Sequence, residues 1–194
     1  TSFAEDVDIV TQNKVRNTGK IVSKTKTNLQ AGGDVDNSGI INSLGNTVVS
    51  AQGDLKNTAH IGAHPNLLAA SQKRIEDSGT LLGQTKTEVT SEGKLHNQGT
   101  IYSSLGNTTV QVKGDVDNMA FIGAKGDTVI QGLGEKSQII SRKDSVLAAG
   151  VAEDKTLLDT GALIVESLGD IHAHGQHQAG DSIQLKAQQV ELEA

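Results

Sequence analysis

The segment GDVDNSGIINS at residues 33–43 is followed at 53–63 by GDLKNTAHIGA, which keeps the same frame of apolar, Asn and small positions. The frame returns as GKLHNQGTIYS at 93–103 and, after a one-residue insertion, as GDVDNMAFIGA at 114–124. Recurrence at a fixed period is the signature of a repeat architecture, in which each repeat is one structural unit that stacks on the next. A repeat of about 20 residues therefore organises the chain.

The repeat can be written as columns, each holding one kind of side chain. Apolar residues head the rows at Val15, Val35, Leu55, Ile75, Leu95 and Val116. Two places later, a structural ladder of amides and one carboxylate is expected at Asn17, Asn37, Asn57, Asp77, Asn97 and Asn118. In-register stacks of this kind link side-chain amides from one layer to the next.

A column of small residues follows the ladder. It contains Gly19, Gly39, Ala59, Gly79, Gly99 and Ala120. We expect the glycines to supply a positive φ, which a Cβ would oppose, and the two alanine corners to turn differently. The next column is apolar again, at Ile21, Ile41, Ile61, Leu81, Ile101 and Ile122.

Within each row, apolar and polar residues alternate, which is the periodicity of a strand with one buried face. Three short arms alternate with three corners, whose motifs are N-x-G, G-N-T and G-D. A coil placed about 4.8 Å above the previous one pairs every arm as a parallel strand. The sequence therefore predicts an all-β fold, a right-handed parallel β-helix with three faces and about 20 residues per rung. A β-sandwich is the alternative, but its strands do not repeat side-chain identity at fixed offsets.

We expect residues 1–194 to form a single β-helical segment. Residues 1–14 are a partial first rung or a cap, and 15–136 are regular rungs. The register blurs over 137–156, which predicts an irregular rung or a loop. Residues 157–194 are expected to form the final rungs, where the pattern returns as Leu157, Asp159, Gly161, Leu163, Ile171, Ala173 and Gly175.

Composition narrows the classes of function. Aromatic residues are 2% of the chain, so small aliphatic side chains must build the core. The net charge is −6 with both signs interspersed, which disfavours binding to nucleic acid or to an anionic membrane. There is no cysteine for a disulfide or a thiolate site. The K-T-K-T motif at 24–27 and the G-N-T corners are expected to present solvated outward rows of Thr, Asn and Lys.

The four quoted segments resemble the haemagglutinin repeats of filamentous-haemagglutinin-type exoproteins, over about 15–135 and again over 157–176. The resemblance implies a filament exported by two-partner secretion to the surface of a Gram-negative cell, in an adhesin or a contact-dependent growth-inhibition toxin. It also implies partners for the parent protein: an outer-membrane secretion partner, and a receptor or glycan on a host or neighbouring cell. The chain is then a structural shaft segment that projects a binding or toxic module. In the alternative, the segment itself is an adhesive surface for a receptor or glycan.

A polysaccharide-lyase-type enzyme is the third interpretation of a β-helix. Such a site needs clustered carboxylates with Arg or Lys, and aromatic platforms for sugars. The sequence offers no such combination, so no enzymatic activity, catalytic residue or cofactor is expected. The aspartates Asp34, Asp54 and Asp115 share one corner column. We interpret them as solvated turn residues beside glycine, with cation binding as the alternative.

The motif H-A-H-G-Q-H at 172–177 is the weak candidate for a metal site. His172 and His174 are two apart on a predicted strand and would both point outward, with His177 just past the corner. Such a trio can chelate zinc or another divalent metal. Three exposed histidines on a polar ladder is the favoured interpretation, because no supporting carboxylate is apparent, and no metal is expected.

The ends of the segment carry one further expectation. A terminal rung exposes unpaired strand edges, which favour pairing with another chain. End-to-end self-association of the fragment is therefore expected, unless residues 1–14 or 177–194 fold over the ends as caps.

Overall fold

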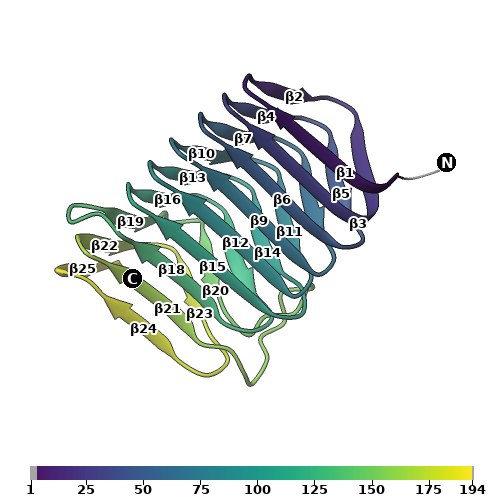
Figure 1. Ribbon diagram of the computed structural model, residues 1–194. Helices are drawn as coiled ribbons and strands as arrows, with labels where there is room; N and C mark the ends of the chain where they lie inside the picture. Colours follow the sequence, from purple (N-terminus) through teal and green to yellow (C-terminus); the bar gives the residue numbers. More distant parts are fainter. Residues whose placement is uncertain (1–3, 194) are drawn as a thin grey trace.

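The computed structural model describes residues 4–193, which form a stack of parallel strands along one axis (Figure 1). No helix occurs among these residues, and the one antiparallel contact is an isolated bridge between Val151 and Leu157. The chain climbs rung by rung from the purple amino-terminal strands to the yellow carboxyl-terminal ones. The predicted all-β solenoid of parallel strands is confirmed.

The strands lie on three faces. The first face is the nine-stranded sheet β2 (Val15–Asn17), β4 (Val35–Asn37), β7 (Leu55–Asn57), β10 (Ile75–Asp77), β13 (Leu95–Asn97), β16 (Val116–Asn118), β19 (Gln138–Ser141), β22 (Asp170–Ala173) and β25 (Gln189–Leu192). The second face comprises the first part of β3 (Lys20–Ala31), then β5 (Ile40–Ser43), β8 (His60–Ala63), β11 (Thr80–Gly83), β14 (Thr100–Ser103), β17 (Phe121–Ala124), β20 (Val146–Ala148) and β23 (Gln176–Gln178). The third face comprises β1 (Ala4–Thr11), the second part of β3, β6 (Asn46–Ala51), β9 (Asn66–Ser71), β12 (Lys86–Ser91), β15 (Asn107–Val112), β18 (Thr128–Gly132), β21 (Leu163–Ser167) and β24 (Ile183–Lys186). Because β3 pairs with both β5 and β6, the second and third faces are one continuous sheet that bends at a corner.

Matching residues of successive rungs lie directly over one another. Ile41 pairs with Ile61, and Ile61 pairs with Leu81, as the predicted columns require. The offset between stacked head residues is 20 from Val15 to Leu95, as shown by the pairings of β2, β4, β7, β10 and β13. The one-residue insertion before Val116 is absorbed without loss of the stacking. The period of about 20 residues per rung is therefore confirmed.

The interior is built from aliphatic columns. The buried members of the main cluster are all Ile, Leu, Val or Ala, and side chains such as Leu29, Ile41 and Ile101 have no exposed surface. Full burial of such a side chain contributes about 1.5–3 kcal/mol. Summed over the rungs, the stacked aliphatic columns supply the burial that aromatic residues provide in other cores.

Threonine residues that were predicted to face outward form a buried column. Thr27, from the K-T-K-T motif, and Thr47, from a G-N-T corner, have no exposed surface. The hydroxyl of Thr47 donates to the carbonyl oxygen of Gly62 at 2.7 Å, and Thr108 makes the equivalent bond to Gly123 at 2.7 Å. A hydroxyl whose hydrogen bond is satisfied inside can be buried at low cost. The prediction of outward Thr rows is therefore wrong at these positions.

The irregular part of the chain differs from the expected one. Residues 137–156, expected as an irregular rung or a loop, contribute the strands β19 and β20, in which Ile139 stacks on Val116 and Leu147 stacks on Ile122. The excursion lies at 149–162, between β20 and β21, and so overlaps the expected irregular segment at 149–156 alone.

The pattern predicted to return at Leu157 is wrong. Leu157 is 49% exposed and lies in the excursion. The next head residue is Ile171, which pairs with Ile139, and Ala173 pairs with Ser141 in the ladder column. The rung at 138–148 is hidden in the sequence because Ser141 replaces the ladder asparagine, so the apolar pattern remains while the N-x-G motif is lost.

Both ends of the described chain keep the stacking. Ile9 of β1 lies over Leu29, and the last rung places Leu185 on Val165 and Val190 on Ile171. The outermost strands of the stack between residues 4 and 193 are therefore β1 and β2 at one end, and β23, β24 and β25 at the other (Figure 1).

Candidate functional site

The asparagine column forms a buried hydrogen-bonded ladder at one corner. Nδ2 of Asn17 donates to Oδ1 of Asn37 at 2.8 Å, and Asn37 donates in the same way to Asn57 at 2.8 Å. Each amide also donates to a backbone carbonyl of the next rung, as Asn37 does to His60 at 3.1 Å. The ladder therefore ties neighbouring rungs together while it leaves no buried amide without a partner in these rungs.

Asp77 breaks the ladder in its middle. Its Oδ1 accepts hydrogen bonds from Nδ2 of Asn57 at 2.7 Å and from the backbone N–H of Gly79 at 3.3 Å. Its Oδ2 takes the place of an amide nitrogen, and has no hydrogen-bond partner among residues 4–193. Burial raises the pKa of the Asp77 carboxyl to about 6, although the bonds from Asn57 and Gly79 act in the opposite direction. This position is therefore the one ladder member whose charge can change near neutral pH.

The column of small residues after the asparagine ladder contains glycine for a different reason from the expected one. Among the described residues, Gly150 and Gly161 are the glycines with positive φ, so the prediction of positive φ in this column is wrong. A Cβ on Gly39 would lie 2.0 Å from the carbonyl oxygen of Gly19 in the rung below. Close approach of stacked corners, not a left-handed turn, selects glycine here.

The alanine corners keep the same hydrogen bonds as the glycine corners. The carbonyl oxygen of Ala59 accepts from the N–H of Thr80, as that of Gly39 accepts from His60, and the N–H of Ala59 donates to Oδ1 of Asn57. The expectation that these corners turn differently is therefore wrong. One methyl group is accommodated at these corners without loss of the hydrogen bonds of the turn.

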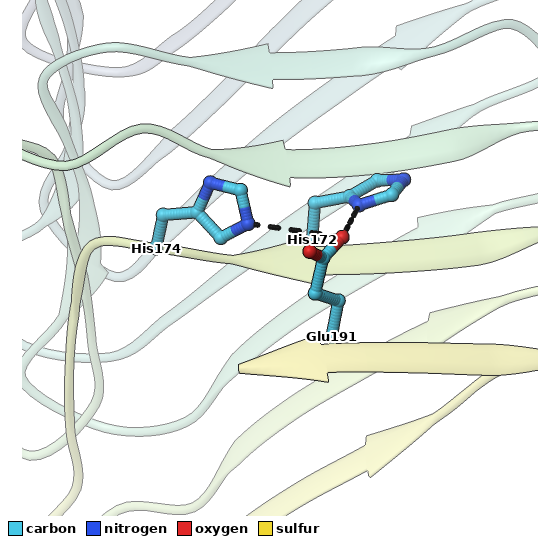
Figure 2. Close-up of side chains that lie close together, drawn as sticks. All are labelled: His172, His174 and Glu191. Atoms are coloured by element: carbon cyan, nitrogen blue, oxygen red, sulfur yellow. Dashed lines mark hydrogen bonds and ion pairs between the residues drawn. The ribbon is translucent and has the colours of Figure 1, made fainter. Parts of the chain in front are cut away.

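His172 and His174 lie together on the outer surface of the first face, near the carboxyl-terminal end of the stack (Figure 2). His172 is on β22, and His174 follows that strand by one residue, so alternation directs both rings outward. Glu191 is the register partner of His172 on the adjacent strand β25. Its Oε2 lies 2.7 Å from Nδ1 of His172 and 4.0 Å from Nε2 of His174.

A second carboxylate stands beside this group. Oε2 of Glu193 lies 3.9 Å from Nδ1 of His174, whereas Glu191 faces the other ring nitrogen, Nε2. Neither glutamate was predicted, because no carboxylate is near the histidines in the H-A-H-G-Q-H motif itself. The outward position of Glu191 and Glu193 could have been predicted from the sequence. Val190 and Leu192 fit the inward positions of the last rung, so alternation directs the two glutamates outward.

His177 does not belong to this group. It lies on β23, pairs with Leu147 of β20 and so continues the inward apolar column, on another face from His172. Burial lowers the pKa of the His177 imidazole. The predicted trio of histidines is therefore replaced by two histidines and one glutamate, because the corner after His174 turns the chain onto the second face.

The corner aspartates are engaged in turns and exposed ion pairs. Oδ1 of Asp34 accepts from the backbone N–H of Asp54 at 2.9 Å, and Oδ2 of Asp54 lies 3.0 Å from Nε of Arg74. Oδ2 of Asp115 pairs with the ammonium group of Lys94 at 2.7 Å. These contacts agree with the interpretation of solvated turn residues.

A shallow groove of about 250 Å³ lies between the second face and the excursion at 149–162. Tyr102 and Phe121 form its aromatic wall, with ring centroids 5.9 Å apart in an edge arrangement. The Tyr102 hydroxyl donates to the carbonyl oxygen of Val151 at 2.7 Å, and the Lys155 ammonium lies 5.6 Å from the Phe121 ring centroid. Two of the few aromatic residues thus anchor the excursion and leave a groove beside it.

The stacked coils, in-register columns and buried amide ladder define the protein as a β-solenoid of short repeats. Its sequence matches the family model of the haemagglutinin repeat over residues 5–59 and 61–118, more than half of the chain. The chain belongs to the haemagglutinin-repeat family, a family of structural and adhesin repeats of secreted or cell-surface proteins. No curated protein and no solved structure matches it. The described residues include no helix that is long and apolar enough to span a membrane.

Proposed function

We propose that this chain is a shaft segment of a large surface-exposed bacterial exoprotein of the two-partner-secretion type, an adhesin or a contact-dependent growth-inhibition toxin. The observation that carries the proposal is the unbroken stacking of the nine-stranded face from β2 to β25. Each rung contacts only its neighbours, so rungs can be added without changing the packing of those already present. A rod built in this way projects a terminal binding or toxic module away from the cell.

The proposed setting is the surface of a Gram-negative bacterium. The parent protein would reach it through an outer-membrane secretion partner, and would meet a receptor or glycan on a host or neighbouring cell. Absence of cysteine supports this route, since a disulfide formed before export would oppose passage of an unfolded chain through a pore.

Deletion of whole rungs in the parent protein tests the shaft role. Removing residues 35–94 deletes three rungs and joins Asp34 to Leu95, which has the same register as Val35. The rod should shorten by about 14 Å while surface display and binding or toxic activity persist. The matched control removes 35–64, which deletes fewer residues but breaks the register and should abolish folding of the rod. Loss of receptor binding by a displayed, folded 35–94 deletion would contradict a purely structural role.

The second candidate function is an adhesive surface on the segment itself, and the groove beside Tyr102 and Phe121 is the observation that favours it. Aromatic rings next to charged groups, here Glu153 and Lys155, are typical of sugar recognition. A glycan array and a cell-binding assay with the folded segment would separate the two functions. Saturable binding that is lost in Phe121→Ala and retained in Leu105→Ala, an exposed position outside the groove, would favour the adhesive surface.

We also propose that the isolated segment associates end to end at high concentration. The last rung presents inward-facing apolar side chains to solvent, since Ile183 is 47% exposed and Leu192 is 68% exposed. Unpaired strand edges with such side chains favour pairing between chains. Sedimentation velocity should show concentration-dependent oligomers, and a monomer at all concentrations would contradict the proposal.

A further inference from the structure

We propose that His172, His174 and Glu191 form a binding site for Zn²⁺ on the outer surface of the last two rungs. The three side chains each offer one ligand atom, and these atoms all lie within 4.8 Å of one another (Figure 2). They come from two adjacent strands, β22 and β25, so the site exists only when the last rung is stacked on the one before it.

The distances around Glu191 fit a shared ion. The same carboxylate oxygen, Oε2, faces Nδ1 of His172 at 2.7 Å and Nε2 of His174 at 4.0 Å. Zinc bonds to imidazole nitrogen and carboxylate oxygen at about 2.0–2.2 Å, which places tetrahedral ligands about 3.3 Å apart. One distance must therefore lengthen and the other shorten by well under 1 Å, which side-chain rotation of an exposed glutamate supplies.

The unpaired nitrogen of His174 is the second observation. Nε2 of His174 is shielded from solvent and has no hydrogen-bond partner among residues 4–193. A shielded polar nitrogen without a partner costs free energy unless a ligand satisfies it. This nitrogen is directed toward Glu191, where an ion between the two side chains would take up its lone pair (Figure 2).

The neighbouring glutamate completes the arrangement. A metal-bound histidine usually donates its other ring N–H to a carboxylate, which fixes the tautomer and the ring orientation. Oε2 of Glu193 lies 3.9 Å from Nδ1 of His174, the ring nitrogen that does not face Glu191, and a small movement would bring it into that role. Glu193 is therefore a positioning residue of the site.

The donor set selects the class of metal. Two imidazole nitrogens and one carboxylate oxygen suit zinc and its transition-metal neighbours, whereas Ca²⁺ and Mg²⁺ prefer sites built from oxygen alone. Three protein ligands leave at least one position on zinc for water or for a group from another molecule. Binding would also fasten the outermost strand β25 to β22, which are otherwise joined by a short ladder.

Isothermal titration of the whole 194-residue chain with Zn²⁺ tests the site, with Co²⁺ absorption as a report of tetrahedral coordination. We expect saturable binding of one ion per chain, weakened at least about tenfold in His172→Asn, His174→Asn and Glu191→Gln. Hydrogen exchange of the β25 amides should slow about tenfold with Zn²⁺ in the wild type and remain unchanged in His174→Asn.

Two control variants leave the three proposed ligands unchanged and test whether Zn²⁺ binding depends on these residues specifically. His177→Asn removes the histidine nearest to the group in the sequence, and His96→Asn removes one that pairs with Asp117 at 3.3 Å on another rung. Both should bind Zn²⁺ as the wild type does, and circular dichroism should show all variants folded. Absence of saturable binding up to about 1 mM Zn²⁺, or equal binding by His174→Asn and wild type, would overturn the proposal.

Discussion

Replacing Asp77 by Asn repairs the break in the ladder and should stabilise the protein at neutral pH. In the intact rungs, each Nδ2 donates to the ladder residue of the next rung and to the carbonyl three residues beyond it, as Asn57 does to Asp77 and Thr80. At position 77 the equivalent acceptors belong to Asn97 and Thr100. An ionised carboxylate has no proton to donate to them, whereas the amide of Asp77→Asn does.

The magnitude follows from the pKa. The pKa of Asp77 rises from 3.8 to about 6 on folding, which corresponds to about 3 kcal/mol, since each tenfold change in proton affinity is worth about 1.4 kcal/mol. The folded chain holds this proton more tightly than the unfolded chain does. The stabilisation is therefore fully present below about pH 4 and is lost as the pH rises through about 6.

Urea denaturation followed by circular dichroism between pH 4 and pH 8 measures the effect. Asp77→Asn should be more stable than wild type by about 3 kcal/mol at pH 8, with the difference vanishing toward pH 4. Glu76→Gln is the control, because it removes the same charge one residue away on the outer face and breaks an exposed contact with Arg74. Its effect should stay within about 0.5 kcal/mol at every pH. A gain for Asp77→Asn that does not vary with pH, or a loss at pH 8, would contradict the role of a buried charge at this position.

Two further substitutions test the core and the excursion. Ile101→Ala opens a cavity at a side chain with no exposed surface, and should lower the free energy of unfolding by about 2–5 kcal/mol. The control Leu105→Ala, at a side chain that is 57% exposed, should change it by less than about 0.5 kcal/mol. Equal losses in the two denaturation midpoints would argue against the stacked core. Tyr102→Phe removes the hydrogen bond from the Tyr102 hydroxyl to Val151 and should lower the local stability of the excursion by about 1 kcal/mol. Trypsin should then cleave faster after Lys155, with little change in global unfolding. Unchanged cleavage would show that the hydroxyl does not hold the excursion.

The regular rungs were predictable because the apolar alternation and the recurring motifs predict the same structure. Alternation fixes the inward face, and the recurrence of Asn37, Asn57 and Asn97 fixes the register. In-register parallel stacking places like side chains together, so the columns written from the sequence are the columns of the fold.

The errors arose where a residue type was interpreted without its neighbours in the stack. Glycine at 39 suggested a positive φ, but the cause is the corner beneath it, where a Cβ at this position would lie 2.0 Å from the carbonyl oxygen of Gly19. Thr47 was placed outside as a polar residue, because the carbonyl that accepts its hydroxyl lies on another arm. The rung at 138–148 lost its motif at Ser141 while it kept its apolar pattern.

The candidate site was predictable in part. Alternation correctly put His172 and His174 on one outer face, and the last-rung pattern also contained the position of Glu191. The excursion at 149–162 was not predictable in detail, since its course depends on the aromatic anchor at Tyr102 and on positive φ at Gly150.

Matching residues of successive rungs lie above one another along a single axis, and distances between paired spin labels measure this stacking. The chain has no cysteine, so double-cysteine variants can be labelled cleanly in the outward column Gln30, Gln111, Gln131, Glu166 and Lys186. Measured from Gln30, the separations should rise by about 4.8 Å per rung, to about 19, 24, 29 and 34 Å. The step from 131 to 166 should equal one rung despite its longer sequence separation. Distances that follow sequence separation instead of rung number would contradict the stacked solenoid.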